Sequence, residues 1–243
     1  MGLAVDDYDG DGRMDILVTN FQNESNTLYR QEEGGFFFDE SGPSGLGAPS
    51  LPWLAWGTRF ADFDLDGWLD LYVANGHVES DIAQVDQLAT WKQPDQLFRN
   101  LGNGTFVELE VAALRVPRVG RGAAFGDLDE DGDTDVVLNN QNGPATLLEA
   151  AGGGAWIGFD VRSDGPNRRG VGWGVDVETD DGRRFRRELR AGGSYLSGND
   201  PRVVVGLGEA PAAVTVTLRR GPGPGTAYGP FEPGRYHRIA VSR

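Results

Sequence analysis

The sequence predicts an all-β protein, and three observations support this prediction. No stretch of useful length shows the apolar periodicity of a helix. Short segments rich in β-branched and aromatic residues recur along the chain and are separated by glycine-rich turns. A nine-residue motif occurs three times with similar flanking segments, which indicates a repeated supersecondary unit.

The composition is that of a folded protein with an acidic excess. The chain has 243 residues, 39% of them apolar, and this is enough to bury a sizeable core. It contains no cysteine, so disulfides, thiol catalysis and cysteine-based metal sites are excluded. No run approaches the roughly 20 apolar residues of a membrane helix, so we expect no membrane insertion. The first residues lack the basic and apolar regions of a signal peptide.

The acidic charge is concentrated in the first part of the chain. Residues 1–150 carry 27 acidic and 8 basic residues, whereas residues 151–243 carry 10 and 14. This balance makes nucleic acid an unexpected partner. Aspartate outnumbers glutamate by 24 to 13, and in a glycine-rich chain this favours turns or cation sites over solvated helices.

The three motifs follow one pattern, D-x-D-x-D-G-x-x-D. They read DYDGDGRMD at residues 7–15, DFDLDGWLD at 62–70 and DLDEDGDTD at 127–135, and an apolar run ending in asparagine follows each. The flanking segments predict about four short strands per unit, which is the content of a β-propeller blade. The third unit has only a shortened counterpart of the later strands.

These patterns divide the chain into two parts. Residues 1–151 are expected to form three blade-like repeats, at about 1–54, 55–119 and 120–151, with a long surface loop inserted at 76–94. Near residues 152–154 the composition changes from aspartate-rich to arginine-rich, which marks a domain boundary. Residues 152–243 are expected to form a small β-sheet or sandwich domain, in which Asp181 and Gly182 suggest a type I′ hairpin turn.

The aspartate loops are candidate calcium sites. Calcium takes six to eight oxygen ligands, and alternate aspartates on a tight loop can converge on one ion. Glycine at position six of each loop permits the turn that brings the later ligands back. The predicted ligands, in about three sites, are the carboxylates of Asp7, Asp9, Asp11, Asp15, Asp62, Asp64, Asp66, Asp70, Asp127, Asp129, Asp131 and Asp135, with the backbone carbonyls of Arg13, Trp68 and Asp133.

Two other interpretations of the loops are possible. An EF-hand needs a glutamate at position 12 and flanking helices, but Val18, Val73 and Leu138 stand there in strand-like runs, so it is rejected. The loops could also be acidic turns without an ion, although a turn needs one or two aspartates rather than four at fixed spacing. Magnesium is disfavoured because it prefers fewer protein ligands.

The motifs and the C-terminal segments carry a family resemblance. The repeats resemble the FG-GAP or VCBS repeats of integrin-type β-propellers, in which the loop binds calcium structurally. The segments NRRGVG at 167–172 and RAGGSYLSGNDPRVVVGLG at 190–208 resemble the ASPIC/UnbV domain, which follows such repeats in the cartilage acidic protein 1-like family. The resemblance implies a secreted, periplasmic or cell-surface protein that binds an unknown protein or glycan in adhesion, without established enzymatic activity.

Several alternatives remain open at this level. Closing a propeller takes at least about four blades, so the three units favour upstream blades that this chain lacks. The alternative function is an extracellular carbohydrate-active enzyme on a propeller scaffold, with Glu79, Asp81 and Asp86 as undistinguished candidate acids. For His77, loop packing is favoured over ligand binding. The run RRFRRELR at 183–190 favours solvated arginines on a sheet, with an anionic partner or docking on the acidic repeats as alternatives.

Overall fold

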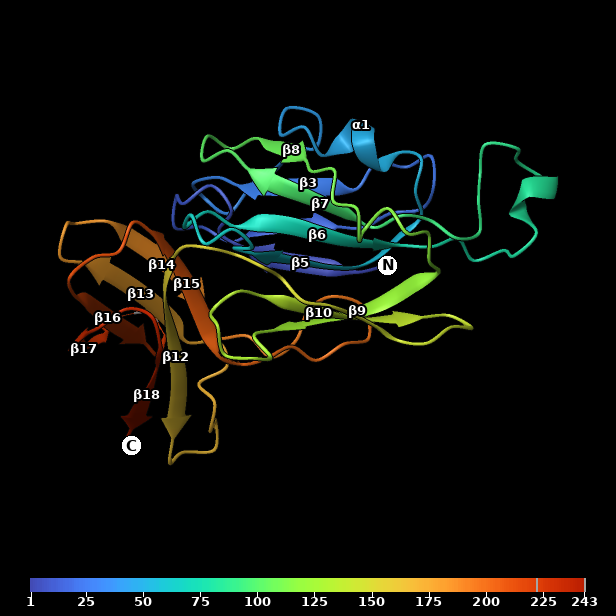
Figure 1. Cartoon of the computed structure of the whole chain (residues 1–243). Coiled ribbons are helices and arrows are strands. Elements are labelled where there is room, and N and C mark those ends of the chain that lie inside the picture. Colours follow the sequence, from blue (N-terminus) through green and yellow to red (C-terminus); the bar gives the residue numbers. More distant parts are fainter. Residues whose placement is uncertain (222, 243) are drawn as a thin grey trace.

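The computed structural model describes residues 1–221 and 223–242 and has the predicted all-β fold. Pro222 and Arg243, which the predicted C-terminal domain includes, lie outside the described residues. The helical segments of the described part are the single turns α1 (Gly47–Ser50) and η1 (Ile82–Gln84). Figure 1 shows small sheets packed on one another, with the C-terminal strands gathered at one end.

Each aspartate motif lies between the first two strands of a small antiparallel sheet. The first two sheets have four strands and the third has three, as the shortened third repeat predicted. Their strands are β1 (Leu3–Asp6), β2 (Asp15–Val18), β3 (Thr27–Gln31) and β4 (Phe37–Asp39); β5 (Ala55–Ala61), β6 (Asp70–Asn75), β7 (Gln96–Asn100) and β8 (Phe106–Glu108); and β9 (Gly120–Gly126), β10 (Asp135–Asn140) and β11 (Thr146–Leu148). We call these sheets blades 1, 2 and 3.

The blades pack face to face through apolar side chains. Leu17 and Leu28 of blade 1 are fully buried in one cluster with Val73 and Phe98 of blade 2. A second cluster joins the opposite face of blade 2 to blade 3. Because neighbouring residues of a strand point to opposite faces, β6 supplies Leu71 and Val73 to the first cluster and Tyr72 and Ala74 to the second. All six residues of β6 are therefore buried.

The C-terminal strands form a sandwich of two sheets around a separate core. One sheet has the order β15-β12-β18 and the other β14-β13-β16-β17. These strands are β12 (Ala155–Ser163), β13 (Gly174–Thr179), β14 (Arg184–Glu188), β15 (Val203–Gly208), β16 (Val214–Arg219), β17 (Thr226–Phe231) and β18 (Tyr236–Val241). Fully buried side chains of both sheets, such as Phe159 and Val216, meet in one cluster, and this forms the sandwich core.

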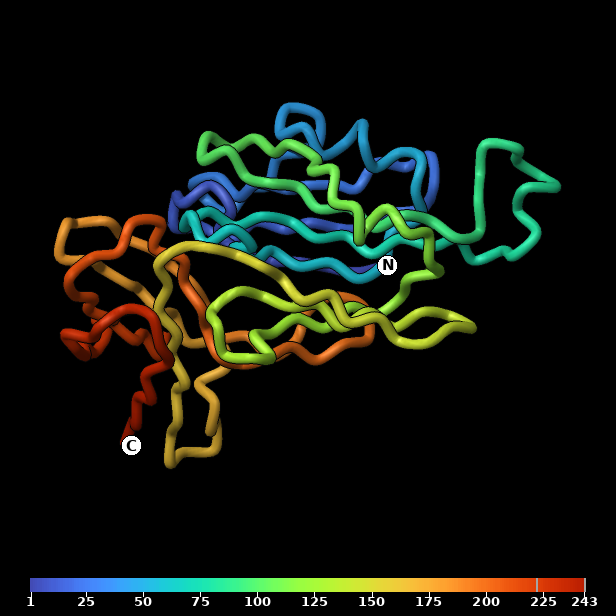
Figure 2. The backbone as a smooth tube through the Cα atoms, viewed as in Figure 1, coloured from blue at the N-terminus to red at the C-terminus, as the bar shows by residue number. Residues whose placement is uncertain are grey.

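The segment between β14 and β15 leaves the sandwich and crosses the first strand of every blade. The backbone N–H of Ser194 donates to the carbonyl of Leu3 in β1 at 2.9 Å. Its hydroxyl accepts from the N–H of Thr58 in β5 at 3.2 Å and donates to the carbonyl of Ala123 in β9 at 2.8 Å. Figure 2 shows this orange segment running along the green strands of blade 3. The C-terminal domain is thereby tied to the blades at their first strands.

Two loops that the sequence predicted, the insertion at 76–94 and the turn at Asp181 and Gly182, differ in outcome. The insertion at 76–94 projects from blade 2 and carries η1 (Figure 1). The predicted type I′ turn is wrong: a type I′ turn needs positive φ at both central residues, and Gly182 has φ +91° while Asp181 is outside this region. Hydrogen bonds from Gly182 N–H to Thr179 and from Thr179 N–H to Arg183 close a three-residue loop instead.

Candidate metal centres

The three aspartate loops share one backbone conformation. Each begins directly after the first strand of its blade and ends on the first residue of the second strand. The glycine at position six lies in the left-handed region, with φ of +87° at Gly12, +101° at Gly67 and +99° at Gly132. Position four is also left-handed, at Gly10, Leu65 and Glu130. A non-glycine residue pays an energetic cost for this conformation. The presence of this conformation in all three repeats therefore shows that the fold of the loop requires a left-handed residue at position four.

The first aspartate of each loop is held by one oxygen and leaves the other free. Oδ2 of Asp7, Asp62 and Asp127 accepts the N–H of the position-six glycine at 2.8, 2.9 and 2.9 Å. These residues are only 3–5% exposed. In all three, Oδ1 is buried and has no hydrogen-bond partner. An unpartnered buried carboxylate oxygen is costly, and its threefold repetition indicates that each loop is shaped to receive a ligand.

The aspartate at position nine joins the loop to the rest of the blade. Oδ2 of Asp15, Asp70 and Asp135 accepts the N–H of the second loop residue at 2.8–3.3 Å. Oδ1 accepts an N–H from a later strand or turn at 2.8–3.1 Å, from residues 31, 100 and 150. Because each carboxylate bridges two backbone segments, the loop is fixed against the sheet. A carboxylate oxygen that accepts one hydrogen bond still has a lone pair for a metal.

The carboxylates that converge form a subset of those predicted. Ligand oxygens lie within 4.8 Å of one another in three groups: Asp7, Asp9 and Asp15; Asp62, Asp64 and Asp66; Asp127, Asp129 and Asp135. The predicted ligands Asp11, Asp70 and Asp131 lie outside these groups. Asp11 pairs with Arg13, whose Nε also donates to the carbonyl of Gln31 at 2.8 Å. The loops thus bring together three carboxylates each.

The sequence predicts a backbone carbonyl ligand at position seven, and in the third loop the side chain at this position is also a carboxylate. Asp133 is 2% exposed, its Oδ1 has no partner, and its Oδ2 accepts the N–H of Gly152 at 2.6 Å. The equivalent Trp68 is 38% exposed, and its N–H donates to Asp66 at 2.8 Å. The third loop therefore contains one more buried carboxylate than the other two, and Asp133 lies outside its group of converging carboxylates.

Burial raises the pKa of several loop carboxyls far above the ordinary value of 3.8. The pKa of Asp7 rises to about 6, that of Asp15 and Asp62 to about 7, and that of Asp70 to about 8. Desolvation is the main cause, and neighbouring aspartates add repulsion. Hydrogen bonds, and at Asp62 also the charge of Arg187, lower the pKa in opposition. A dication would relieve both effects, because it stabilises the ionised form.

The donor set fits a hard divalent cation. Calcium binds carboxylate and carbonyl oxygens, and each loop supplies clustered carboxylates together with at least one buried oxygen that has no other partner. The loops contain no thiolate or imidazole donors, since the chain lacks cysteine and neither histidine lies in a motif. The residues present therefore fit calcium.

The residues considered for other chemistry lie away from the loops. His77 is 3% exposed, its Nδ1 accepts the N–H of Glu79 at 3.1 Å, and it packs against Phe21, so the predicted loop packing is confirmed. Glu79 and Asp81 are exposed on the projecting insertion, and Asp86 is half-buried there.

The arginine run behaves differently from the favoured prediction. Arg184 is exposed and pairs with Glu178, but Arg187 is 8% exposed and donates to the carbonyl of Gly67 at 2.9 Å. Arg186 donates to the carbonyl of Gly12 at 2.8 Å. Solvated arginines were therefore the wrong interpretation for these two residues, which dock on the aspartate loops. The alternative of docking on the acidic repeats fits both residues. No sequence pattern pointed to Gly206 and Tyr236, which donate to Asp62 and Asp127.

Comparison with known proteins agrees with the repeats and with the C-terminal domain. The FG-GAP-like repeat family matches residues 7–73 and 81–138, which is just over half of the chain, and the ASPIC and UnbV family matches residues 163–219. Cartilage acidic protein 1 of Mus musculus is 46% identical over 56 residues, and that of Xenopus tropicalis is 43% identical over 57. These matches cover 22% and 23% of this chain but only 9% of each relative.

One solved structure aligns with the chain only weakly. A backbone protein of the group B streptococcus pilus 2b aligns over 100% of this chain and 97% of that chain, but with 10% identity and a TM-score of 0.22, which bears no argument about the fold. Within the described residues, no helix is long and apolar enough to cross a membrane. From the repeats, their loops and the family matches, the chain belongs to the FG-GAP-like repeat family and carries an ASPIC and UnbV domain behind its repeats.

Proposed function

We propose that this chain is a non-catalytic, calcium-binding interaction module of a secreted, periplasmic or cell-surface protein. The observation that carries the proposal is the buried, unpartnered Oδ1 of Asp7, Asp62 and Asp127, which occurs in the same place in all three loops. The FG-GAP-like repeats and the similarity to cartilage acidic protein 1 support an extracellular setting and an adhesion-type role without catalysis.

Calcium acts in this proposal by rigidifying the loops. In each loop, three carboxylates with ligand oxygens within 4.8 Å of one another repel and destabilise the loop when no cation is bound. A bound dication converts that repulsion into attraction and fixes the ends of the first two strands in each blade. Magnesium is the weaker candidate, because it demands octahedral geometry and retains several waters.

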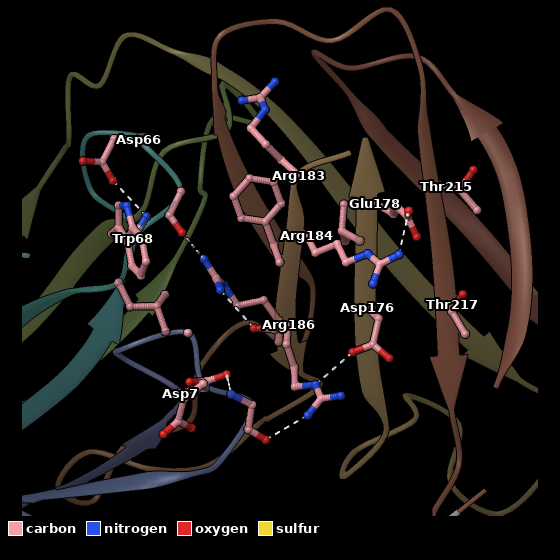
Figure 3. A pocket seen from close by; sticks show the side chains of 18 residues that line it. Asp7, Asp66, Trp68, Asp176, Glu178, Arg183, Arg184, Arg186, Thr215 and Thr217 are labelled. Carbon is pink, nitrogen blue, oxygen red and sulfur yellow. Dashed lines mark hydrogen bonds and ion pairs between the residues drawn. The ribbon is translucent and has the colours of Figure 1, made fainter. Parts of the chain in front are cut away.

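The partner that we propose is a protein or glycan, held on the blade and sandwich surfaces that the calcium loops rigidify. The open cleft between loops 1 and 2 and the sandwich has a volume of about 770 Å³ and is lined by Trp68, Arg183, Arg184 and Thr217, among others. Figure 3 shows these four side chains among those that line the cleft. An exposed tryptophan beside arginines and hydroxyls supports a polar ligand of this kind.

A further repeat blade is the partner that we propose for the outer face of blade 1. Its apolar residues Val5, Ile16, Val18, Tyr29 and Phe37 are half-buried or exposed. The equivalent residues of blade 2, identified by motif offset and strand pairing, are Phe60, Leu71, Val73, Phe98 and Phe106, and all of them are buried against blade 1. The face thus has the composition of a surface that receives a preceding blade.

Calcium titration of the whole chain tests the proposed function. We expect about three equivalents of calcium to bind by calorimetry, and the melting temperature to fall in EDTA and recover with calcium but not with equimolar magnesium. Asp129→Asn should remove one equivalent, whereas the control Glu79→Gln, on the projecting insertion, should retain all of them. A melting temperature that is unchanged by EDTA, without calcium binding, would overturn the proposal.

A further inference from the structure

The C-terminal domain contacts the position-six glycine of every aspartate loop. A Cβ atom on these glycines would lie 2.7 Å from Nη1 of Arg186 at Gly12, would lie 2.5 Å from the ring of Phe185 at Gly67 and would overlap the ring of Trp156 at Gly132. The three side chains come from β14 and β12 of the sandwich. At Gly67 and Gly132 the aromatic rings leave room for glycine alone, whereas at Gly12 the neighbour is the end of the flexible Arg186 side chain.

The second loop receives backbone donors from strand β15. The N–H of Gly206 donates to Oδ2 of Asp62 at 3.1 Å, and the N–H of Gly208 donates to the carbonyl of Leu65 at 2.9 Å. A Cβ on Gly206 would overlap Oδ2 of Asp62 and lie 2.5 Å from Cα of Leu65. The strand therefore packs directly against the loop. Oδ2 of Asp62 accepts two hydrogen bonds, from the N–H groups of Gly67 and Gly206.

The third loop receives a hydroxyl from strand β18. Tyr236 OH donates to Oδ2 of Asp127 at 2.7 Å, and its ring packs on Trp156 with centroids 5.3 Å apart. Arg202 lies over the ring of Tyr236 at 4.2 Å and donates to the backbone carbonyl of Asp127 at 2.6 Å. It also pairs with Glu130 of the same loop at 3.0 Å. Asp127 therefore has the same arrangement as Asp62, with Oδ2 bound by two donors and Oδ1 free.

The first loop is contacted by an arginine of the same strand that contacts the second. Arg186 bridges Asp176 in β13 and the carbonyl of Gly12, and Figure 3 shows Arg186 beside Asp176. Arg187, the next residue, reaches Gly67 in loop 2. One strand of the sandwich thus fixes the separation of loops 1 and 2.

We propose that the C-terminal domain completes the second and third metal centres, with Gly206 and Tyr236 as positioning residues. Each occupies Oδ2 of a position-one aspartate and leaves the buried Oδ1 to ligate the ion. This inference rests on the proposed function, because it assigns the domain a part in those same calcium sites. Both domains then contribute residues to the second and third metal centres.

The arrangement links calcium binding to domain docking. Docking orients Asp62 and Asp127 for the ion, so it raises the affinity of loops 2 and 3 for calcium. By thermodynamic reciprocity, calcium stabilises the docked domain by the same factor. Removal of calcium should therefore loosen strands β15 and β18 from the loops while the core of the sandwich, built from its own side chains, remains intact.

Tyr236→Phe in the full chain tests the positioning role without changing any charge. Loss of the hydroxyl should weaken one calcium site about tenfold in a calorimetric titration, because a hydrogen bond to a charged group is removed. The matched control is Tyr228→Phe in the same domain. The ring of Tyr228 packs on the sandwich core, and the loss of its hydroxyl should leave the calcium affinity of all sites unchanged. Equal affinities in wild type, Tyr236→Phe and Tyr228→Phe would overturn the inference.

Amide hydrogen exchange of the unmodified chain tests the linkage independently. With calcium, the amides of Gly206 and Gly208 should be protected; in EDTA they should exchange at least about tenfold faster, while the core amide of Val216 changes little. Exchange at Gly206 and Gly208 that is the same in calcium and EDTA, in a protein that binds calcium, contradicts domain linkage alone. Absence of calcium binding contradicts the proposed function itself, so the two failures are distinguishable.

Discussion

Ser194 joins the first strands of all three blades, and its closest relationship is with Ala123. Its hydroxyl donates to the carbonyl of Ala123 in β9 at 2.8 Å and accepts from the N–H of Thr58 in β5. Its own N–H donates to Leu3 in β1. The residue has φ +65°, in the left-handed region, so the chain accepts local strain to place it there. One side chain of the C-terminal domain thus satisfies backbone groups of two blades.

Ser194→Ala should destabilise the chain by about 1–2 kcal/mol. The substitution leaves the N–H of Thr58 and the carbonyl of Ala123 without their hydroxyl partner, in a partly buried place. Urea unfolding at saturating calcium measures the change. The control is Ser197→Ala, because the hydroxyl of Ser197 donates to Tyr195 in its own turn. If both variants lose the same small amount, Ser194 does not connect the blades energetically.

Gly206→Ala should lower the free energy of unfolding by at least about 2 kcal/mol, because the added Cβ would overlap Asp62 and the backbone of Leu65. Relief requires β15 to move away from loop 2. The loss is measured by thermal melting with calcium present. Gly192→Ala is the matched control in the same domain, since a Cβ there meets nothing within 4 Å. A wild-type melting temperature for Gly206→Ala would contradict the close packing of strand and loop.

The sequence predicted the parts of the site that local pattern determines. The aspartate spacing and the position-six glycine repeat three times, so the loops and their candidate ligands could be located without a structure. The left-handed position four was visible only at Gly10, since Leu65 and Glu130 carry no such signal. The donors Gly206 and Tyr236 lie 144 and 109 residues from the aspartates they hold. Contacts over such separations depend on tertiary packing, which a single sequence does not encode in any local pattern.

The outer face of blade 1 gives a paired prediction. Phe37 and Phe106 are equivalent in the blades, but Phe37 is 41% exposed and Phe106 is 6% exposed. In this chain Phe106→Ala should lower the free energy of unfolding by about 3–5 kcal/mol, and Phe37→Ala should lower it by less than about 1 kcal/mol. Urea unfolding measures both changes.

A chain extended at its N-terminus by a second copy of residues 55–119 tests whether this face receives a blade. If the copy docks, Phe37 becomes buried and Phe37→Ala becomes as costly as Phe106→Ala. A cost for Phe37→Ala that stays small in the extended chain would show that the face does not accept a blade of this kind.

The stability of the metal-free chain should fall as pH rises. Burial raises the pKa of Asp7 to about 6, of Asp62 to about 7 and of Asp70 to about 8, so the folded state binds protons more tightly than the unfolded state. The stabilisation is fully present below the unfolded pKa of about 4 and is lost as pH rises through about 6 to 8. Calcium replaces the protons, so its affinity should increase over the same interval.

Melting temperatures in EDTA at about pH 5.5 and pH 8.5 measure this effect, with the higher value expected at the lower pH. Excess calcium should raise the melting temperature most at pH 8.5, where the carboxylates are ionised. Asp39→Asn is the control: hydrogen bonds from Ser41 lower the pKa of Asp39, so it stays ionised throughout the interval and its removal should not alter the pH dependence. A melting temperature in EDTA that is constant or rises between these pH values would mean that the buried carboxyls carry no protons in the metal-free fold.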